Sequence, residues 1–317
     1  GAMAAATQLI APEFHFVLLV VGFTLFCMFV QIFTPYEKYV KYLKYLVFVL
    51  FSYVATAFLV NIDYQQLLYH TVVPSVTFSK EQLFLITAIL GTTISPYLFF
   101  WQTSHEVEEE ILHGKTNLRL REGTTRQELK KMRVDVWTGM FVSNLVMYFI
   151  IATCAAVLFS HGITTINTAA EAAAALRPLA GEYAFLLFAL GIVGTGLLAV
   201  PILAGSAAYT AAESFNWKSG LYRKLHQARP FYGVIMLSML LGMAINFLGV
   251  DPIKMLIFSA VVNGLVAPLI LFLIVQMTSN KRVVKEHVNS PLQAAFGWYI
   301  TGLMALCGAA TIVSFLL

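Results

Sequence analysis

Long apolar runs separated by short polar stretches repeat along the whole chain. Each run approaches the roughly 20 residues that a helix needs to cross the hydrocarbon core of a bilayer. In hydrocarbon such a run satisfies its own backbone N–H and C=O groups as an α-helix, whereas an alternating strand does not. The runs cover residues 14–33, 45–61, 83–101, 137–159, 183–209, 231–248, 253–277 and 296–317. The pattern predicts an all-α polytopic membrane protein with about eight transmembrane helices.

The composition agrees with this class of protein. Of 317 residues, 59% are hydrophobic and 11% are charged, and the mean hydropathy is +0.78. Soluble domains carry about 25% charged residues, so the lipid bilayer must solvate most of this surface. The first run lacks the basic flank and the small-residue cleavage site of a signal peptide, and we expect it to stay in the membrane as a span.

Basic residues fall on one side of this topology. Of the 20 Lys and Arg residues, 17 lie in the stretches after the first, third, fifth and seventh runs. Cytoplasmic loops collect Lys and Arg, so residue 14 and the C-terminus are expected outside, as in a multi-pass protein of a bacterial cytoplasmic membrane. The net charge of +4 is thus a topology signal, and it gives no support for nucleic-acid binding. The longest polar stretch, 105–134, is expected to be a solvated connector.

The third run is polar in its middle, around Pro96. Proline lacks an N–H and crowds the carbonyl one turn earlier, which leaves the Thr92 carbonyl without its helical donor, and Gly91 loosens the turn before it. Freed carbonyls at the midplane coordinate cations in many secondary transporters, so Thr92, Ser95 and Tyr97 are candidate metal ligands. The alternative is a plain kink, in which hydroxyl groups bond back to their own helix.

A second polar interruption falls in the seventh run. Asn263 is followed by Gly264, with Pro268 one turn later. An amide in hydrocarbon is costly unless it is paired, and its oxygen suits a hard metal ion. Asn263 is therefore a fourth candidate ligand, although a hydrogen bond between helices is the equally ordinary explanation.

Acidic residues follow the broken run directly. Gln102, His105, Glu106 and Glu109 define a possible vestibule at its cytoplasmic end, which would draw cations or pass protons. The alternative is a solvated helix face, and the like charges would then need compensation from the basic residues that follow.

Enzymatic chemistry has no support in the sequence. The three cysteines lie in apolar runs without a CxxC spacing, and no Ser/His/Asp, HExxH or phosphate-loop pattern occurs. We expect no catalytic activity and no cofactor.

Residues 92–102, 34–39 and 258–263 resemble the NRAMP divalent-metal transporters, specifically a divergent bacterial branch, and the similarity runs along the whole chain. The resemblance implies a LeuT-type fold of two inverted five-helix repeats with extra helices. It also implies divalent metal transport such as that of manganese or iron, with protons as a possible coupling ion in symport. The broken run would be the family's sixth helix.

The family motif Met-Pro-His is Ser95-Pro96-Tyr97 in this chain. A hydroxyl therefore replaces a thioether, and because oxygen donors suit harder ions, magnesium becomes a candidate substrate. The resemblance assigns the carbonyl that the family contributes before its methionine to Thr92.

Two further departures affect coupling and coordination. The metal-facing glutamine of the family's tenth helix falls on Ala260, and Asn263 would substitute for it one turn later. Tyr97 and Gln102 occupy two histidine positions of the family, which weakens the expectation of proton coupling.

The resemblance also places residue 1 inside the family's third helix, and the opening Gly-Ala-Met-Ala-Ala-Ala reads as the end of a helix. We therefore expect a single transporter domain over residues 1–317 that is incomplete at its N-terminus and does not transport on its own. Two alternatives stay open: a LeuT-type carrier of an organic solute such as an amino acid, and a non-transporting membrane scaffold.

Overall fold

The computed structural model describes residues 1–74, 79–249 and 252–316, and the part of the chain so described contains helices and no strands. The long or buried helices are α1 (Ala2–Ile10), α2 (Phe16–Phe33), α3 (Tyr36–Leu59), α5 (Lys80–Thr93), α6 (Pro96–Leu112), α8 (Arg126–Val157), α9 (Ala169–Ala180), α10 (Glu182–Ser214), α11 (Arg229–Ile245), α12 (Pro252–Thr278) and α14 (Pro291–Leu316). Shorter helices are α4 (Tyr64–Val72), α7 (Leu118–Arg121) and α13 (Lys281–Val284). Leu317, the end of the last predicted run, lies outside the described residues.

The helices confirm the predicted class. Seven segments of the described chain are long and apolar enough to cross a membrane, with α5 and α6 counted together, and α11 is a shorter apolar helix at the position of the sixth predicted run. The prediction that the opening residues belong to a helix also agrees with α1.

Two predicted boundaries are wrong. The second run was expected to begin at residue 45, but α3 begins at Tyr36, directly after Pro35. The stretch 105–134 was expected to be a connector, but α6 continues to Leu112 and α8 begins at Arg126. The polar residues sit on helical extensions, and α8 starts with a capping box that Thr125 and Glu128 form. The length of an apolar run indicates which part of a helix lies in lipid. The ends of the helix are set by its capping residues instead.

The described residues form two compact units, and each is described by itself. Unit 1 comprises residues 1–72 and 100–252, and unit 2 comprises residues 73–99 and 253–317. In unit 1, α10 packs against α1, α2, α3, α9 and α11. Glycines allow the close approach of α3: a Cβ atom on Gly191 would lie 2.6 Å from the Tyr53 ring, and one on Gly194 would lie 2.5 Å from Val49.

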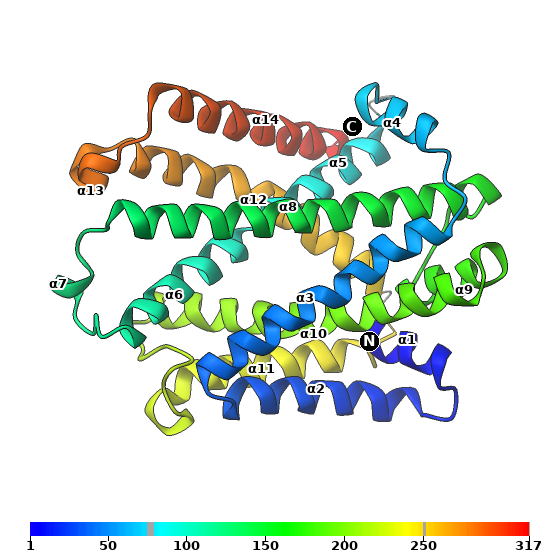
Figure 1. Ribbon diagram of the computed structural model, residues 1–317, viewed down its shortest axis with the longest axis horizontal. Coiled ribbons are helices and arrows are strands. Elements are labelled where there is room, and N and C mark those ends of the chain that lie inside the picture. Colours follow the sequence, from blue (N-terminus) through cyan, green and yellow to red (C-terminus); the bar gives the residue numbers. More distant parts are fainter. Residues whose placement is uncertain (75–78, 250–251, 317) are drawn as a thin grey trace. The chain divides into compact units, whose positions relative to one another are not determined.

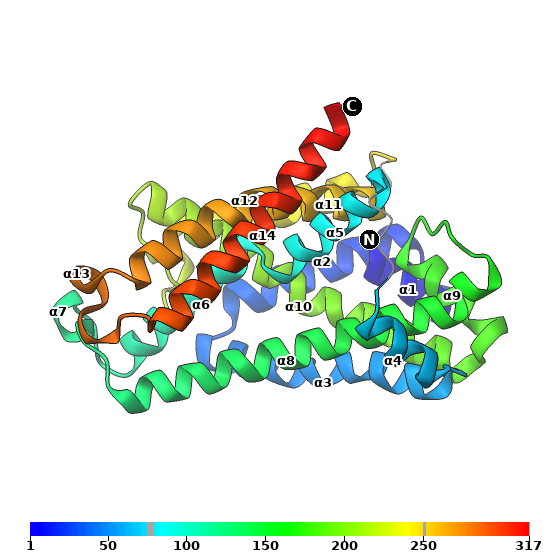
Figure 2. The ribbon, with the colours of Figure 1, turned by 90° about the horizontal axis from the view of Figure 1, so that it is seen from above.

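The connections of unit 1 separate by charge. The connections α2–α3, α6–α8 and α10–α11, which lie in or beside the basic stretches, gather at one end of the unit, whereas α1–α2, α3–α4 and α8–α9 lie at the other (Figures 1 and 2). This separation matches the positive-inside pattern that the sequence predicts for these helices.

In unit 2, α5 packs against α12 and α14. The Thr87 and Thr311 hydroxyl oxygens lie 2.7 Å apart, and each also lies within hydrogen-bond distance of a backbone carbonyl of the facing helix, Thr87 at 3.2 Å from that of Cys307 and Thr311 at 3.3 Å from that of Leu83. Against α12 the contact is backbone on backbone: a Cβ atom on Gly91 would lie 2.2 Å from the carbonyl oxygen of Ala260 and 2.3 Å from the amide nitrogen of Gly264. Such contacts join helices in lipid, where small residues let backbones approach.

The first prediction concerns this contact. Gly91→Ala places a methyl group against backbone atoms that cannot rotate away, so we expect a loss of stability of about 1–3 kcal/mol, the usual cost of overpacking. Thermal unfolding in one detergent measures it. Gly302→Ala in α14 is the control, because a Cβ atom there meets nothing within 4 Å and alanine is a better helix former than glycine. Equal effects of the two changes would contradict the packing argument.

Candidate metal site and vestibule

The segment around Pro96 is interrupted within unit 2. Helix α5 ends at Thr93 and α6 begins at Pro96, and Ile94 between them has φ −113° and ψ 69°, outside the helical region. Proline disfavours the helical conformation for the residue before it, Ser95, and brings no N–H of its own, so a regular helix cannot continue through this segment. The chain resumes as a helix with the Leu98 N–H donating to the Ser95 carbonyl at 3.0 Å.

The interruption changes the partners of two carbonyls. Thr92 lacks its helical donor because residue 96 is proline. The Ser95 hydroxyl lies 2.7 Å from the Thr92 carbonyl oxygen and 2.8 Å from that of Gly91. A hydroxyl has one proton, so it satisfies one of these carbonyls at a time. The structure therefore combines both interpretations of the sequence: the helix is broken, and a hydroxyl bonds back across the break.

The other candidate ligands of this segment differ in what they offer. The Thr92 side chain is exposed and its hydroxyl donates to the Ile89 carbonyl at 2.8 Å, so Thr92 offers its carbonyl to the break. Ser95 is 1% exposed, and Tyr97 is half-buried at the start of α6.

Asn263 lies in α12, in the same unit. Its side chain is half-buried and makes no hydrogen bond to any of the residues that the structure describes. The next residue, Gly264, contacts Gly91, one turn before Ser95. Unit 2 therefore brings the α12 segment that carries Asn263 against the segment that carries the break. All four candidate ligands offer neutral oxygen atoms, and among the described residues no three His, Cys, Asp or Glu side chains gather as a metal site.

The predicted vestibule residues line one cavity of unit 1. Gln102, His105, Glu106 and Glu109 border a space of about 760 Å³ between α3, α6 and α8. The Gln102 amide donates to Glu106 at 3.0 Å. The same cavity is also lined by Glu110, Glu128 and Asp135 and by Lys44, Lys115 and Lys131.

The basic connector compensates part of this acidic lining. The Lys115 ammonium lies 3.0 Å from Glu128 and 3.1 Å from Glu110, and these contacts raise the pKa of Lys115. Lys115 thus compensates Glu110 and Glu128, whereas Glu106 and Glu109 have no ion-pair partner among the described residues, and the vestibule is a mixed-charge cavity with an acidic excess.

Sequence reasoning missed the different position of Glu108. It is 2% exposed and does not line the vestibule, whereas its neighbours Glu106 and Glu109 do. The signal was helical spacing: Trp101, Ser104 and Glu108 recur at i, i+3 and i+7, which places all three on one face of α6, and all three are buried.

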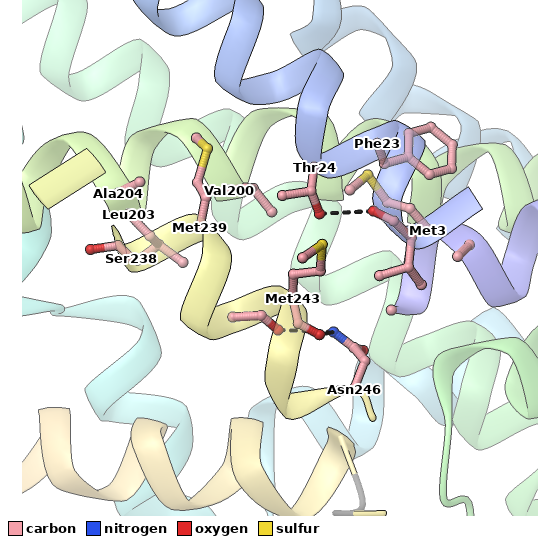
Figure 3. A pocket seen from close by; sticks show the side chains of 14 residues that line it. Met3, Phe23, Thr24, Val200, Leu203, Ala204, Ser238, Met239, Met243 and Asn246 are labelled. Atoms are coloured by element: carbon pink, nitrogen blue, oxygen red, sulfur yellow. Dashed lines mark hydrogen bonds between the residues drawn. The ribbon is translucent and has the colours of Figure 1, made fainter. Parts of the chain in front are cut away.

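A second cavity of unit 1, of about 300 Å³, was not predicted either (Figure 3). Met3, Met239 and Met243 line it together with Thr24 and Asn246. The Thr24 hydroxyl donates to the Val20 carbonyl, and the Asn246 amide donates to the carbonyls of Gly242 and Met243. Thr24 and Asn246 are thus bonded to their own helices, and the lining is mainly apolar.

Comparisons with known proteins agree with the resemblance. Residues 1–314 match the family model described as natural resistance-associated macrophage protein-like (Nramp). The divalent metal cation transporter MntH of Caldanaerobacter subterraneus subsp. tengcongensis is 27% identical over 257 residues, 80% of this chain and 56% of that protein. MntH of Klebsiella pneumoniae subsp. pneumoniae is 25% identical over 272 residues, 84% of this chain and 60% of that protein. The chain thus spans less than two thirds of these relatives.

The second prediction tests the role of Ser95 at the break. Ser95→Ala removes the hydroxyl that serves the Gly91 and Thr92 carbonyls, and an unsatisfied buried carbonyl costs about 1–3 kcal/mol. Thr93→Ala is the matched control, because the Thr93 hydroxyl bonds to the Ile89 carbonyl, which the helix already supplies with an N–H. We expect thermal unfolding to show a clear loss for Ser95→Ala and a change within about 0.5 kcal/mol for Thr93→Ala. A Ser95→Ala protein as stable as the control would contradict this role.

Proposed function

The chain belongs to the Nramp family, and on this premise we propose that the protein is a secondary transporter that moves divalent metal cations across the bacterial cytoplasmic membrane. The family consists of transporters rather than enzymes. Two of its relatives are named as divalent metal cation transporters. The helices of the described chain support a multi-pass membrane protein, and family membership supports the LeuT-type arrangement of its repeats.

The observation that carries the proposal is the interruption between α5 and α6. Two carbonyls share a single hydroxyl proton there, so at least one carbonyl oxygen can turn to an ion without breaking a helix bond. Asn263 adds an amide oxygen without a partner among the described residues. An ion that enters would replace the hydrogen bond of the Ser95 hydroxyl, whose O–H would rotate away while its oxygen serves as a further ligand. Thr92, Ser95, Tyr97 and Asn263 are the proposed donors.

The donor set favours hard ions. Carbonyl, hydroxyl and amide oxygens suit magnesium, calcium and manganese, whereas thioethers suit softer metals. Ser95 stands where the family resemblance places a methionine, so we propose that magnesium and manganese are carried in preference to cadmium. The acidic excess of the vestibule would raise the local concentration of cations without chelating them.

Coupling is a separate matter. Tyr97 and Gln102 stand where the resemblance places histidines, and neither side chain exchanges protons as an imidazole does. Metal uptake measured with and without an inward pH gradient decides whether protons are the coupling ion.

The third prediction tests Asn263. In cells that express the full-length protein, Asn263→Ala should lower magnesium uptake about tenfold, equivalent to about 1.4 kcal/mol for a lost ligand. Ser259→Ala, one turn earlier on α12, is the control, because the exposed Ser259 hydroxyl bonds to its own helix at Leu256. A carrier of organic solutes would show no metal uptake, and neither would a scaffold. Wild-type protein without metal uptake would therefore refute the proposal.

The fourth prediction tests selectivity at Ser95. Ser95→Met introduces a thioether at the break, and we expect the ratio of cadmium to magnesium uptake to rise about tenfold, because a soft ligand gains more from a soft ion. Uptake from mixtures of the two ions, with equal protein in the membrane, measures the ratio. Wild-type protein that accepts cadmium and ignores magnesium would overturn the assignment of a hard-ion site.

A further inference from the structure

Glu108 is a buried carboxyl group to which the metal site assigns no role. It lies on α6 with 2% of its surface exposed, and the residues packed in the same core of unit 1 include Trp101, Tyr209 and Leu221. Glutamate is almost never fully buried unless it is paired, so its partners decide its charge state.

Both hydrogen bonds of Glu108 reach one oxygen. Its Oε1 accepts from the Tyr209 hydroxyl on α10 and from the Leu221 N–H in the α10–α11 connection, the latter at 2.6 Å. Its Oε2 is buried and has no partner among the described residues. An ionised carboxylate has about four acceptor positions, and this environment fills two of them, both at the same oxygen.

No described cation lies within ion-pair distance of Glu108. The ion pairs within the described ranges join Lys115 to Glu110 and Glu128, and Arg177 to Glu182. Arg223, in the same connection as Leu221, donates its Nε to the Ser219 carbonyl at 3.1 Å and stacks its guanidinium over the Tyr222 ring.

The other titratable groups around Glu108 do not supply a positive charge. Tyrosines face it from three elements: Tyr36 and Tyr39 from α3, Tyr209 from α10 and Tyr232 from α11. On its own helix, His105 bonds through Nδ1 to the Tyr36 hydroxyl at 3.0 Å, and Glu106 and Glu109 are negative when ionised. The surroundings are therefore neutral hydroxyl groups, one histidine, like charges and the positive charge of Arg223, which acts on Glu108 from beyond ion-pair distance.

A buried carboxylate without a counter-ion costs several kcal/mol, and such groups neutralise instead. We propose that Glu108 is a proton-binding site, which holds a proton near neutral pH and in this neutral form fastens α6 to the α10–α11 connection through Tyr209 and Leu221. In this form Oε1 is the carbonyl oxygen that accepts both hydrogen bonds and Oε2 carries the proton, and a neutral O–H left unpaired costs less than an anionic oxygen left unpaired. When the proton passes to water, Oε2 needs donors that only water supplies, so the connection must open. The site does not depend on metal transport.

Infrared difference spectroscopy of the full chain tests the proton directly. Spectra of wild-type protein minus Glu108→Gln near neutral pH should contain the C=O stretching band of a protonated carboxylic acid, shifted in D₂O. Glu122→Gln is the control, because Glu122 is exposed and its change should remove no such band. Wild-type protein without this band near neutral pH, or a band that persists in Glu108→Gln, overturns the proposal.

Two further measurements remain decisive if Glu108→Gln fails to fold. Tyr209→Phe keeps the ring and removes one hydrogen bond, so the carboxylic acid band should remain and move to higher frequency. Amide exchange of residues 215–228, corrected for its chemical rate, should rise with pH in wild-type protein as Glu108 ionises and the connection opens. A band unmoved in Tyr209→Phe, or corrected exchange independent of pH, overturns the proposal.

Discussion

Backbone hydrogen bonding inside the membrane is the constraint on which this structure depends. Hydrocarbon offers no partners, so each N–H and C=O in a span must be satisfied within the protein or face a cavity or ligand. Pro96 leaves the Thr92 carbonyl without its helical N–H donor, and the buried Ser95 hydroxyl donates to that carbonyl instead. The Ser95 hydroxyl has one proton for two carbonyls, those of Gly91 and Thr92, so it cannot satisfy both at once. A carbonyl without its own donor in the middle of a span is where we propose that an ion binds.

Helix contacts within unit 2 hold the interruption between α5 and α6 in place. The α5 turn that precedes the break packs closely on α12, because Gly91 and Gly264 let the two backbones come into contact. On another side of α5, the Thr87 and Thr311 hydroxyls bond to each other and to the facing helices. Rigid surroundings matter for a site of neutral donors, because the positions of the oxygens must discriminate among ions that differ mainly in size.

The sequence predicted most of the fold because apolar length and proline act locally. A run of apolar residues must become a helix in lipid, and Pro96 must disturb the helix before it, whatever the rest of the chain does. The ends of α3, α6 and α8 escaped prediction because caps and polar extensions set them. The environment of Glu108 was not predicted either, because the local sequence around Glu108 resembles that around Glu106 and Glu109. Helical spacing places Glu108 on the same face of α6 as Trp101. Its partners Tyr209 and Leu221, however, lie 101 and 113 residues away in the chain, and no local sequence pattern predicts them.

The oxygen-bearing groups of this protein lie in three different environments: the vestibule, the site of Glu108 and the break in unit 2. The charge of each group follows from how it is solvated. The vestibule carboxylates border a cavity and include Glu110 and Glu128, which share the ammonium of Lys115, and we propose that they attract cations. Glu108 is enclosed without a cation, and a proton is the lowest-cost neutralisation. The break in unit 2 presents neutral oxygens, with no cluster of ionisable ligands among the described residues. Neutral oxygens bind a divalent ion less tightly than carboxylates do, and a carrier requires a site that releases its ion as readily as it takes it up.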